Sequence, residues 1–66
     1  MDVEREIRAR EADWEAIERL PPKVKRAVLL YIETGDLYKA AKLAGMPLDE
    51  FNQLRIRLRI PVVINL

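Results

Sequence analysis

The chain has 66 residues, of which half are hydrophobic, and its 12 basic and 11 acidic side chains leave a net charge of +1. It contains no Cys and no His, so a disulfide is excluded and a zinc site would need carboxylates alone. A chain of this length forms one small domain, and so much apolar surface in so small a domain predicts association, most simply a two-fold homodimer.

Residues 1–20 are expected to form an acidic amphipathic helix, with residues 2–19 helical. No Gly or Pro interrupts this segment, and apolar side chains recur at steps of three and four residues. Seven acids and four arginines give it a net charge of −3, whereas eight basic and four acidic residues give the remainder +4. The apolar stripe is predicted to pack either on its own domain or on a second subunit, with Trp14 as an anchor. The stripe consists of Val3, Ile7, Trp14, Ile17 and Leu20.

Two further helices are predicted next in the chain. Pro22 suits the first turn of a helix over residues 23–34, and Gly35 suits its C-terminal cap. Asp36 then suits the N-terminal cap of a short helix over residues 37–44. The buried stripe of the longer helix is expected to consist of Val24, Ala27, Val28, Tyr31 and Ile32.

A sharp turn is predicted at Gly45, followed by a fourth helix from about Pro47 to Arg59. Two short helices joined by a tight Gly-containing turn form the DNA-binding unit of many regulators. Such a unit needs a small residue where the helices cross, a Gly at the turn and apolar anchors beneath the second helix. Residues 21–60 are therefore predicted to form a helical helix-turn-helix domain. The residues that meet these needs are Ala41, Gly45, Met46, Phe51 and Leu54.

The segment LRIRLRI, from Leu54 to Ile60, has two interpretations. Strict alternation of apolar and basic residues is typical of a strand. Strong helix formers and the preceding turn favour a helix, which we expect here. In that helix Phe51, Leu54 and Leu58 would face the core, and Ile56 and Ile60 would need cover from the N-terminal helix or from a second subunit.

Residues 61–66 are predicted to form a short strand, because Pro61 ends the helix and Val62, Val63 and Ile64 are β-branched. A lone strand leaves its backbone unpaired, so its mate is expected to be the same strand of a second chain or a strand of another protein. The sequence therefore predicts an all-α fold: a small, dimeric four-helix domain with a helix-turn-helix and a short C-terminal β-strand.

The stretch GDLYKAAKLAGMPLDEF, followed by IPVV, resembles a family of small prokaryotic proteins with the pattern Gly, a few residues, AAxLAGMxxxEF and then IPV. That family is similar to VapB-type antitoxins and is commonly paired with PIN-domain toxin nucleases. The resemblance covers roughly residues 28–64. It implies a homodimer that binds its own operator DNA as an autorepressor, and a segment that inhibits the toxin. A weaker likeness of LPPKVKRAVLLYIETGDLYKAAKLAG to the last domain of bacterial sigma factors supports the same fold.

The fourth helix carries side chains suited to a DNA groove. Asn52 and Gln53 suit adenine edges, and basic side chains beside them suit phosphates, whereas Asp49 would meet phosphate unfavourably. As an alternative, these basic residues are ordinary solvated side chains, and the same fold docks on a partner protein without binding DNA. The predicted DNA contacts are Lys39, Lys42, Asn52, Gln53, Arg55, Arg57 and Arg59. The predicted partner or dimer interface consists of Trp14, Ile56, Ile60, Val62, Val63 and Ile64.

Catalysis is not expected, and neither is a metal or cofactor. With no Cys, His or Ser, and with Thr34 as the sole aliphatic hydroxyl, the chain lacks a usual nucleophile–base pair. The start is densely charged, unlike a signal peptide, and no apolar run approaches the roughly 20 residues that cross a bilayer. We therefore expect a cytoplasmic protein with no membrane partner. High charge with few Asn and Gln fits a thermophile.

Overall fold

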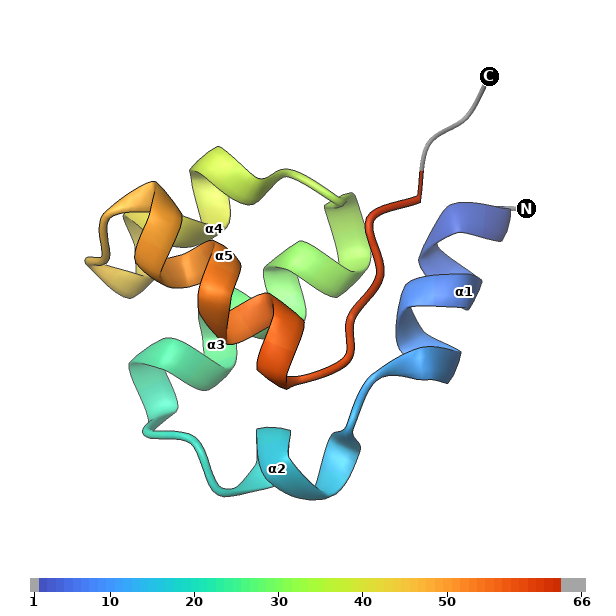
Figure 1. The fold of residues 1–66 in the computed structure, drawn as a ribbon, viewed down its shortest axis with the longest axis horizontal. Coiled ribbons are helices and arrows are strands. Elements are labelled where there is room, and N and C mark those ends of the chain that lie inside the picture. The colour runs from blue at the N-terminus through green and yellow to red at the C-terminus, as the bar shows by residue number, and fades with distance from the viewer. Residues whose placement is uncertain (1, 64–66) are drawn as a thin grey trace.

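The computed structural model describes residues 2–63, which contain five helices (Figure 1). The helices expected over residues 23–34 and 37–44 are confirmed, and the fourth expected helix is present but ends at Arg57. The described residues are thus helical, as predicted, with one helix more than predicted. The elements are α1 (Val3–Glu11), α2 (Trp14–Glu18), α3 (Pro22–Thr34), α4 (Leu37–Ala44) and α5 (Leu48–Arg57).

The N-terminal segment forms two helices, so the single helix predicted over residues 2–19 is wrong. Ala12 is extended, with ψ of 146°, and the Asp13 carboxylate accepts a hydrogen bond from the Ala16 N–H at 3.1 Å. An Asp side chain that caps a new helix competes with continuation of the old one, which is why the chain turns here.

This turn also breaks the apolar stripe predicted for the N-terminal segment. Ile17 is fully buried, but Val3 is 55% exposed and Trp14 is 40% exposed. The turn after α1 moves the residues of α2 out of phase with those of α1, so a single helical period cannot describe both. The buried residue of α1 is Arg8 instead.

Helix α3 lies at the centre of the fold and contacts α1, α2 and α4. Helix α4 turns Ala40, Ala41 and Ala44 inward, and these small side chains let its neighbours approach closely. Phe51 of α5 meets Tyr31 of α3 edge to face, with 6.3 Å between ring centres. The stripe predicted for α3 is confirmed, with Ala27, Val28, Tyr31 and Ile32 buried and Val24 half-buried.

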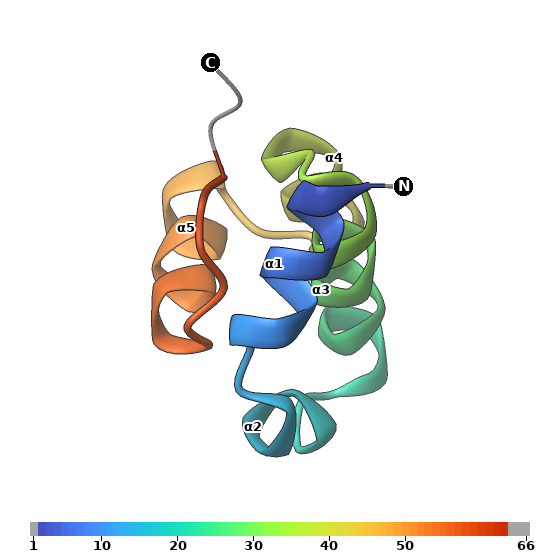
Figure 2. The same cartoon turned by 90° about the vertical axis from the view of Figure 1, so that its right-hand side faces the viewer.

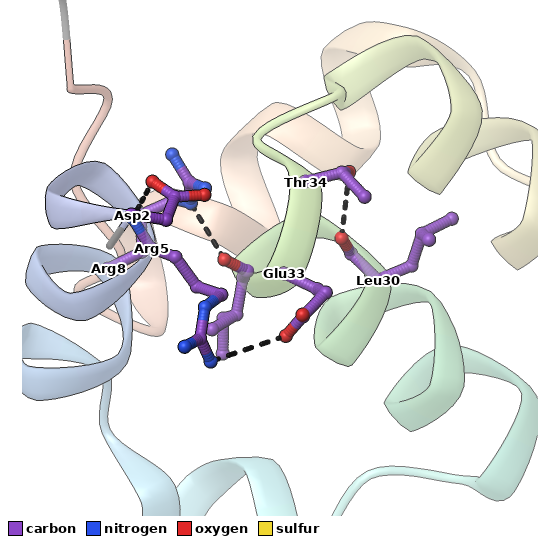
Figure 3. A network of polar contacts seen from close by, with 7 residues as sticks. Asp2, Arg5, Arg8, Leu30, Glu33 and Thr34 are labelled. Carbon is purple, nitrogen blue, oxygen red and sulfur yellow. Dashed lines mark hydrogen bonds and ion pairs between the residues drawn. The ribbon is translucent and has the colours of Figure 1, made fainter.

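Arg8 is the only charged residue that is buried among residues 2–63, and it fastens α1 to the end of α3 (Figure 3). Its Nε donates a hydrogen bond to the Ile32 carbonyl oxygen at 2.8 Å. This carbonyl lies in the last turn of α3, where carbonyls lack helical partners and form the negative end of the helix dipole. Gly35 follows with φ of 72°, and a Cβ there would lie 2.8 Å from Nη1 of Arg8. The bare backbone at Gly35 therefore makes room for the guanidinium.

Figure 3 also shows weaker polar contacts at the start of α1 and in the last turns of α3. The Asp2 carboxylate caps α1 by accepting from the Arg5 N–H at 3.0 Å, and this hydrogen bond lowers the pKa of Asp2. Arg5 also pairs with Glu33 of α3 at 3.6 Å, through side chains that are largely in solvent. Thr34 donates to the Leu30 carbonyl at 2.9 Å. Exposed pairs of this kind add little stability, so Arg8 is the main polar link between α1 and α3.

The chain reverses direction after α5 and returns between α5 and α1 (Figures 1 and 2). Arg59 takes a φ of 60° at this reversal, and Leu58 and Ile60 on either side of it are buried. The Leu58 carbonyl accepts from the Asp13 N–H at 2.8 Å, so the junction of α1 and α2 caps the end of α5. The segment LRIRLRI is therefore helical as far as Arg57, and the alternative of a strand is wrong.

No strand is present between residues 2 and 63, so Val62 and Val63 lack the predicted strand within a single copy. Ile64, the third residue of that strand, lies outside the described residues. A strand formed only by pairing with a second chain stays a prediction, as does the dimer.

We expect Gly35→Ala to destabilise the fold more than Gly45→Ala. Both glycines are left-handed, so either substitution should cost about 1–2 kcal/mol of backbone strain. At Gly45 a Cβ would meet only the Nζ of Lys23, at 3.1 Å, and this exposed side chain can move away. Chemical denaturation measures the free energy of unfolding of each variant. When Arg8→Met is added to both, the difference between the two glycine variants should disappear. Equal losses for both glycine variants in the parent chain would contradict the contact between Arg8 and Gly35.

Candidate nucleic-acid interface

Helices α4 and α5 are joined by a tight turn at residues 45–47, as the sequence predicted. Gly45 caps α4 with φ of 71°, and the Met46 N–H donates to the Ala41 carbonyl at 3.0 Å. The left-handed Gly and this hydrogen bond end one helix and aim the chain into the next. Figure 1 shows the turn at the end of the molecule farthest from α1. Figure 2 shows α5 on the opposite side of the molecule from α3 and α4.

Helix α5 has one face in the core and one face in solvent. Phe51 is buried and Leu54 packs against the core, as predicted. The outer face starts with two carboxylates, continues through an amide and an isoleucine, and ends with an arginine. Such a face offers both hydrogen-bond donors and hydrogen-bond acceptors to a bound molecule. Its exposed residues are Asp49, Glu50, Gln53, Ile56 and Arg57.

Most of the predicted DNA contacts are exposed. Within residues 2–63 none of the basic ones among them forms an ion pair, whereas several basic residues of the N-terminal half do. Unpaired cations on α4 and at the end of α5 are free to meet an anion. These exposed candidates are Lys39, Lys42, Gln53, Arg57 and Arg59.

Arg55 and Asn52 are engaged with each other. Nε of Arg55 donates to Oδ1 of Asn52 at 2.9 Å, and Nη1 donates to the Ile60 carbonyl at 2.9 Å. Both side chains are only half exposed. Arg55 thus holds the chain reversal after α5, and the Asn52 carboxamide keeps its NH₂ group and one lone pair of Oδ1 free for another partner.

The predicted interface residues differ widely in exposure. Ile60 is buried within its own chain, because the left-handed Arg59 turns it back to the core. Ile56 is 52% exposed and Val62 is 55% exposed, so each keeps an uncovered apolar surface. Val63 is half-buried, and Ile64 lies outside the described residues.

Trp14, another predicted interface residue, also has a task inside the chain. Its indole N–H donates to the Ala9 carbonyl at 2.6 Å, in the last turn of α1. The ring is nonetheless 40% exposed. Trp14 therefore joins α1 to α2 and still offers part of its ring to solvent.

Tyr38 of α4 is a candidate that sequence reasoning missed. It is 74% exposed, more than the other exposed large apolar side chains among the described residues. Helical spacing could have indicated it, because Tyr38 lies four residues before Lys42 and therefore on the same side of α4. Tyr31, in contrast, is a core residue: burial raises the pKa of its phenol, so it stays neutral near pH 7.

Other kinds of site receive no support from the described part of the chain. Residues 2–63 contain no group of three or more Asp or Glu side chains placed to hold a metal ion. None of the five helices is long and apolar enough to cross a membrane. Comparison of the chain with protein-family models, curated proteins and solved structures found no match.

We expect Arg55→Ala to lower the stability of the fold and Arg57→Ala to leave it nearly unchanged. Arg55 would lose two hydrogen bonds and leave a half-buried carbonyl unpaired, a loss of about 1–3 kcal/mol. Arg57 is exposed, so its removal should change stability by no more than about 0.5 kcal/mol. Urea unfolding of both variants is the measurement. If Arg57→Ala lost as much stability as Arg55→Ala, the structural role given to the Arg55 hydrogen bonds would be contradicted.

Proposed function

We propose that this protein binds duplex DNA through α4 and α5 as a helix-turn-helix. The observation that carries the proposal is the tight α4–α5 turn, with exposed cations on α4 and at the end of α5 that have no acidic partner in residues 2–63. In this arrangement the second helix enters the major groove and the helix before it crosses the phosphate backbone. Lys39 and Lys42 would then meet phosphates, as would Arg57.

The outer face of α5 supports reading of particular bases. Gln53 is exposed and suits the N6 and N7 edge of adenine. Asp49 and Glu50 repel phosphates, but a carboxylate accepts from the N4 amino group of cytosine. These acids disfavour binding that depends on phosphates alone. The proposed function is therefore recognition of a defined sequence.

The wider role that we propose is that of an antitoxin and autorepressor in a toxin–antitoxin pair. It rests on the resemblance of residues 28–64 to VapB-type antitoxins, which implies a PIN-domain nuclease as partner. Such a regulator would act as a homodimer on two half-sites about one helical turn apart. Exposed Ile56 and Val62 are available for that dimer or for the toxin.

We expect the full chain to retard a duplex of about 30 base pairs at low salt, and the double variant Lys39→Ala/Lys42→Ala to bind it more weakly. Each lost phosphate contact should make the slope of log K against log salt shallower by about 1. The slope of the double variant should therefore be shallower by about 2. Arg10→Ala is the control, because Arg10 is also exposed but lies on α1. Fluorescence anisotropy over a salt series measures both quantities.

Two outcomes would contradict the proposal. One is no binding of DNA at about 50 mM salt by a folded chain. The other is a salt slope that the two lysine substitutions do not change.

A second candidate function is docking onto a partner protein without DNA. The observation that favours it is Ile56, which is 52% exposed in the outer face of α5 and has no hydrogen bond to offer a base. Gln53→Ala separates the two functions. If DNA is read, this substitution should cost about 1–3 kcal/mol of discrimination at one base pair. If the face binds only protein, Ile56→Ala should abolish cellular activity while Gln53→Ala leaves it intact.

A further inference from the structure

An open groove lies between α4 and the start of α5, with a volume of about 400 Å³. Its floor is apolar, because the buried Ala41 and the half-buried Met46 and Leu48 line it. Two lysines stand at its rim. The lining residues are Tyr38, Lys39, Ala41, Lys42, Met46 and Leu48.

The apolar part of this groove is adaptable. Met46 and Leu48 are half-buried, and Tyr38 is 74% exposed, so its ring lies largely in solvent. Met side chains are flexible and fit apolar partners of irregular shape. Concave surfaces of about this volume, lined by apolar side chains with a few polar groups at the edge, are typical of binding sites.

The charges around the groove are asymmetric. On the α4 side, Lys39 and Lys42 are exposed and form no ion pair within residues 2–63. On the α5 side, Asp49 and Glu50 follow Leu48 directly and are exposed. A ligand with carboxylates would be attracted to the α4 wall and repelled from the α5 wall. The groove therefore favours a ligand that is acidic on one side and apolar on the other.

We propose that this groove binds an acidic amphipathic helix of a partner protein. The apolar side chains of that helix would lie against Met46 and Leu48, and its carboxylates would pair with Lys39 and Lys42. Docking of an apolar helix face into a groove is a common mode of peptide recognition. Backbone phosphates of DNA could use the lysines, but they would leave the apolar floor unfilled.

A second copy of this chain is a poorer fit, although its first 20 residues are acidic. The carboxylates of its α2 already pair within the chain, Glu15 with Arg19 at 2.8 Å and Glu18 with Lys25 at 2.9 Å. The exposed ring of Trp14 is also held by the hydrogen bond from its indole to α1. The acids of its α1 stand among exposed arginines of the same helix, which the groove lysines would repel. A separate acidic protein segment is therefore the occupant that we assign.

The same lysines serve the DNA-binding function proposed above. If that function holds, the acidic helix and DNA compete for Lys39 and Lys42, and the partner would release the protein from DNA. This competition rests on the proposed function, whereas the binding of the acidic helix does not.

The test is a titration of the full chain against labelled synthetic peptides of about 14 residues, long enough to become helical when bound. The first peptide has Trp and Leu on one helical face and Glu on the other. A second has the same composition, scrambled so that no apolar face forms. A third carries Lys in place of Glu. We expect the first peptide to bind at least tenfold more tightly than either control in fluorescence anisotropy.

Substitutions then locate the site. Lys42→Glu should weaken binding of the first peptide roughly tenfold, because it replaces an exposed attraction with a repulsion. The matched control is Arg26→Glu, which changes the net charge equally at an exposed position of α3 that does not line the groove. It should leave the affinity within about twofold, because substitutions away from the contact have small effects. Tyr38→Ser tests the apolar wall at an exposed position that the fold does not need.

Equal binding of the scrambled peptide, or equal loss with Lys42→Glu and Arg26→Glu, would overturn the assignment. Concentration-dependent self-association that Lys42→Glu abolishes and Arg26→Glu leaves intact would overturn it in favour of a second copy. Failure of DNA binding alone would remove the competition and leave the groove assignment standing. Failure of peptide binding with DNA binding intact would remove the groove assignment and leave the proposed function.

Discussion

The fold depends on two hydrogen bonds that the N-terminal segment donates to the ends of other helices. Nε of Arg8 meets the Ile32 carbonyl at the end of α3, and the Asp13 N–H meets the Leu58 carbonyl after α5. The last carbonyls of a helix have no partner within it, and leaving one buried and unpaired costs stability. Because both carbonyls accept these hydrogen bonds, α1 and α2 close the core of α3, α4 and α5 inside one copy of the chain. The apolar Ile60 is thereby covered without a partner.

Closure on the α1 side leaves the α4–α5 side of the molecule open (Figure 1). The N-terminal segment covers the ends of α3 and α5, but it lies away from the tight turn and from the groove beside it. Most exposed cations without an ion pair in residues 2–63 are concentrated on α4 and at the end of α5, whereas the acids of α2 are paired locally. Scaffold and working surface thus occupy different parts of a small domain. Such a division would let the proposed binding surface engage a partner without loss of the core.

Local signals in the sequence were sufficient for α3, α4 and the start of α5. Pro22, Gly35, Asp36 and Gly45 each act within a few residues, so their helix boundaries could be predicted. Asp13 could not be singled out, because among the many acids of the N-terminal segment nothing local marks the one that caps a new helix.

Contacts between distant residues were also beyond prediction. Burial of Arg8 depends on the end of α3, which lies 24 residues later in the chain, and burial of Ile60 depends on the left-handed conformation of Arg59. Exposure of the site residues followed the helical period well in α4. In α5 the helical period did not predict exposure beyond Arg57, because the helix ends there, sooner than expected.

Hydrogen exchange at the Asp13 amide shows whether the N-terminal segment completes the core of a single copy. NMR under native conditions reports the free energy of the opening that exposes each amide. A closed core predicts that Asp13 exchanges as slowly as the buried amides of α3, through global unfolding, at every protein concentration. Exchange of Asp13 at the rate of an unprotected amide, while α3 stays protected, would show that the N-terminal segment does not close the core.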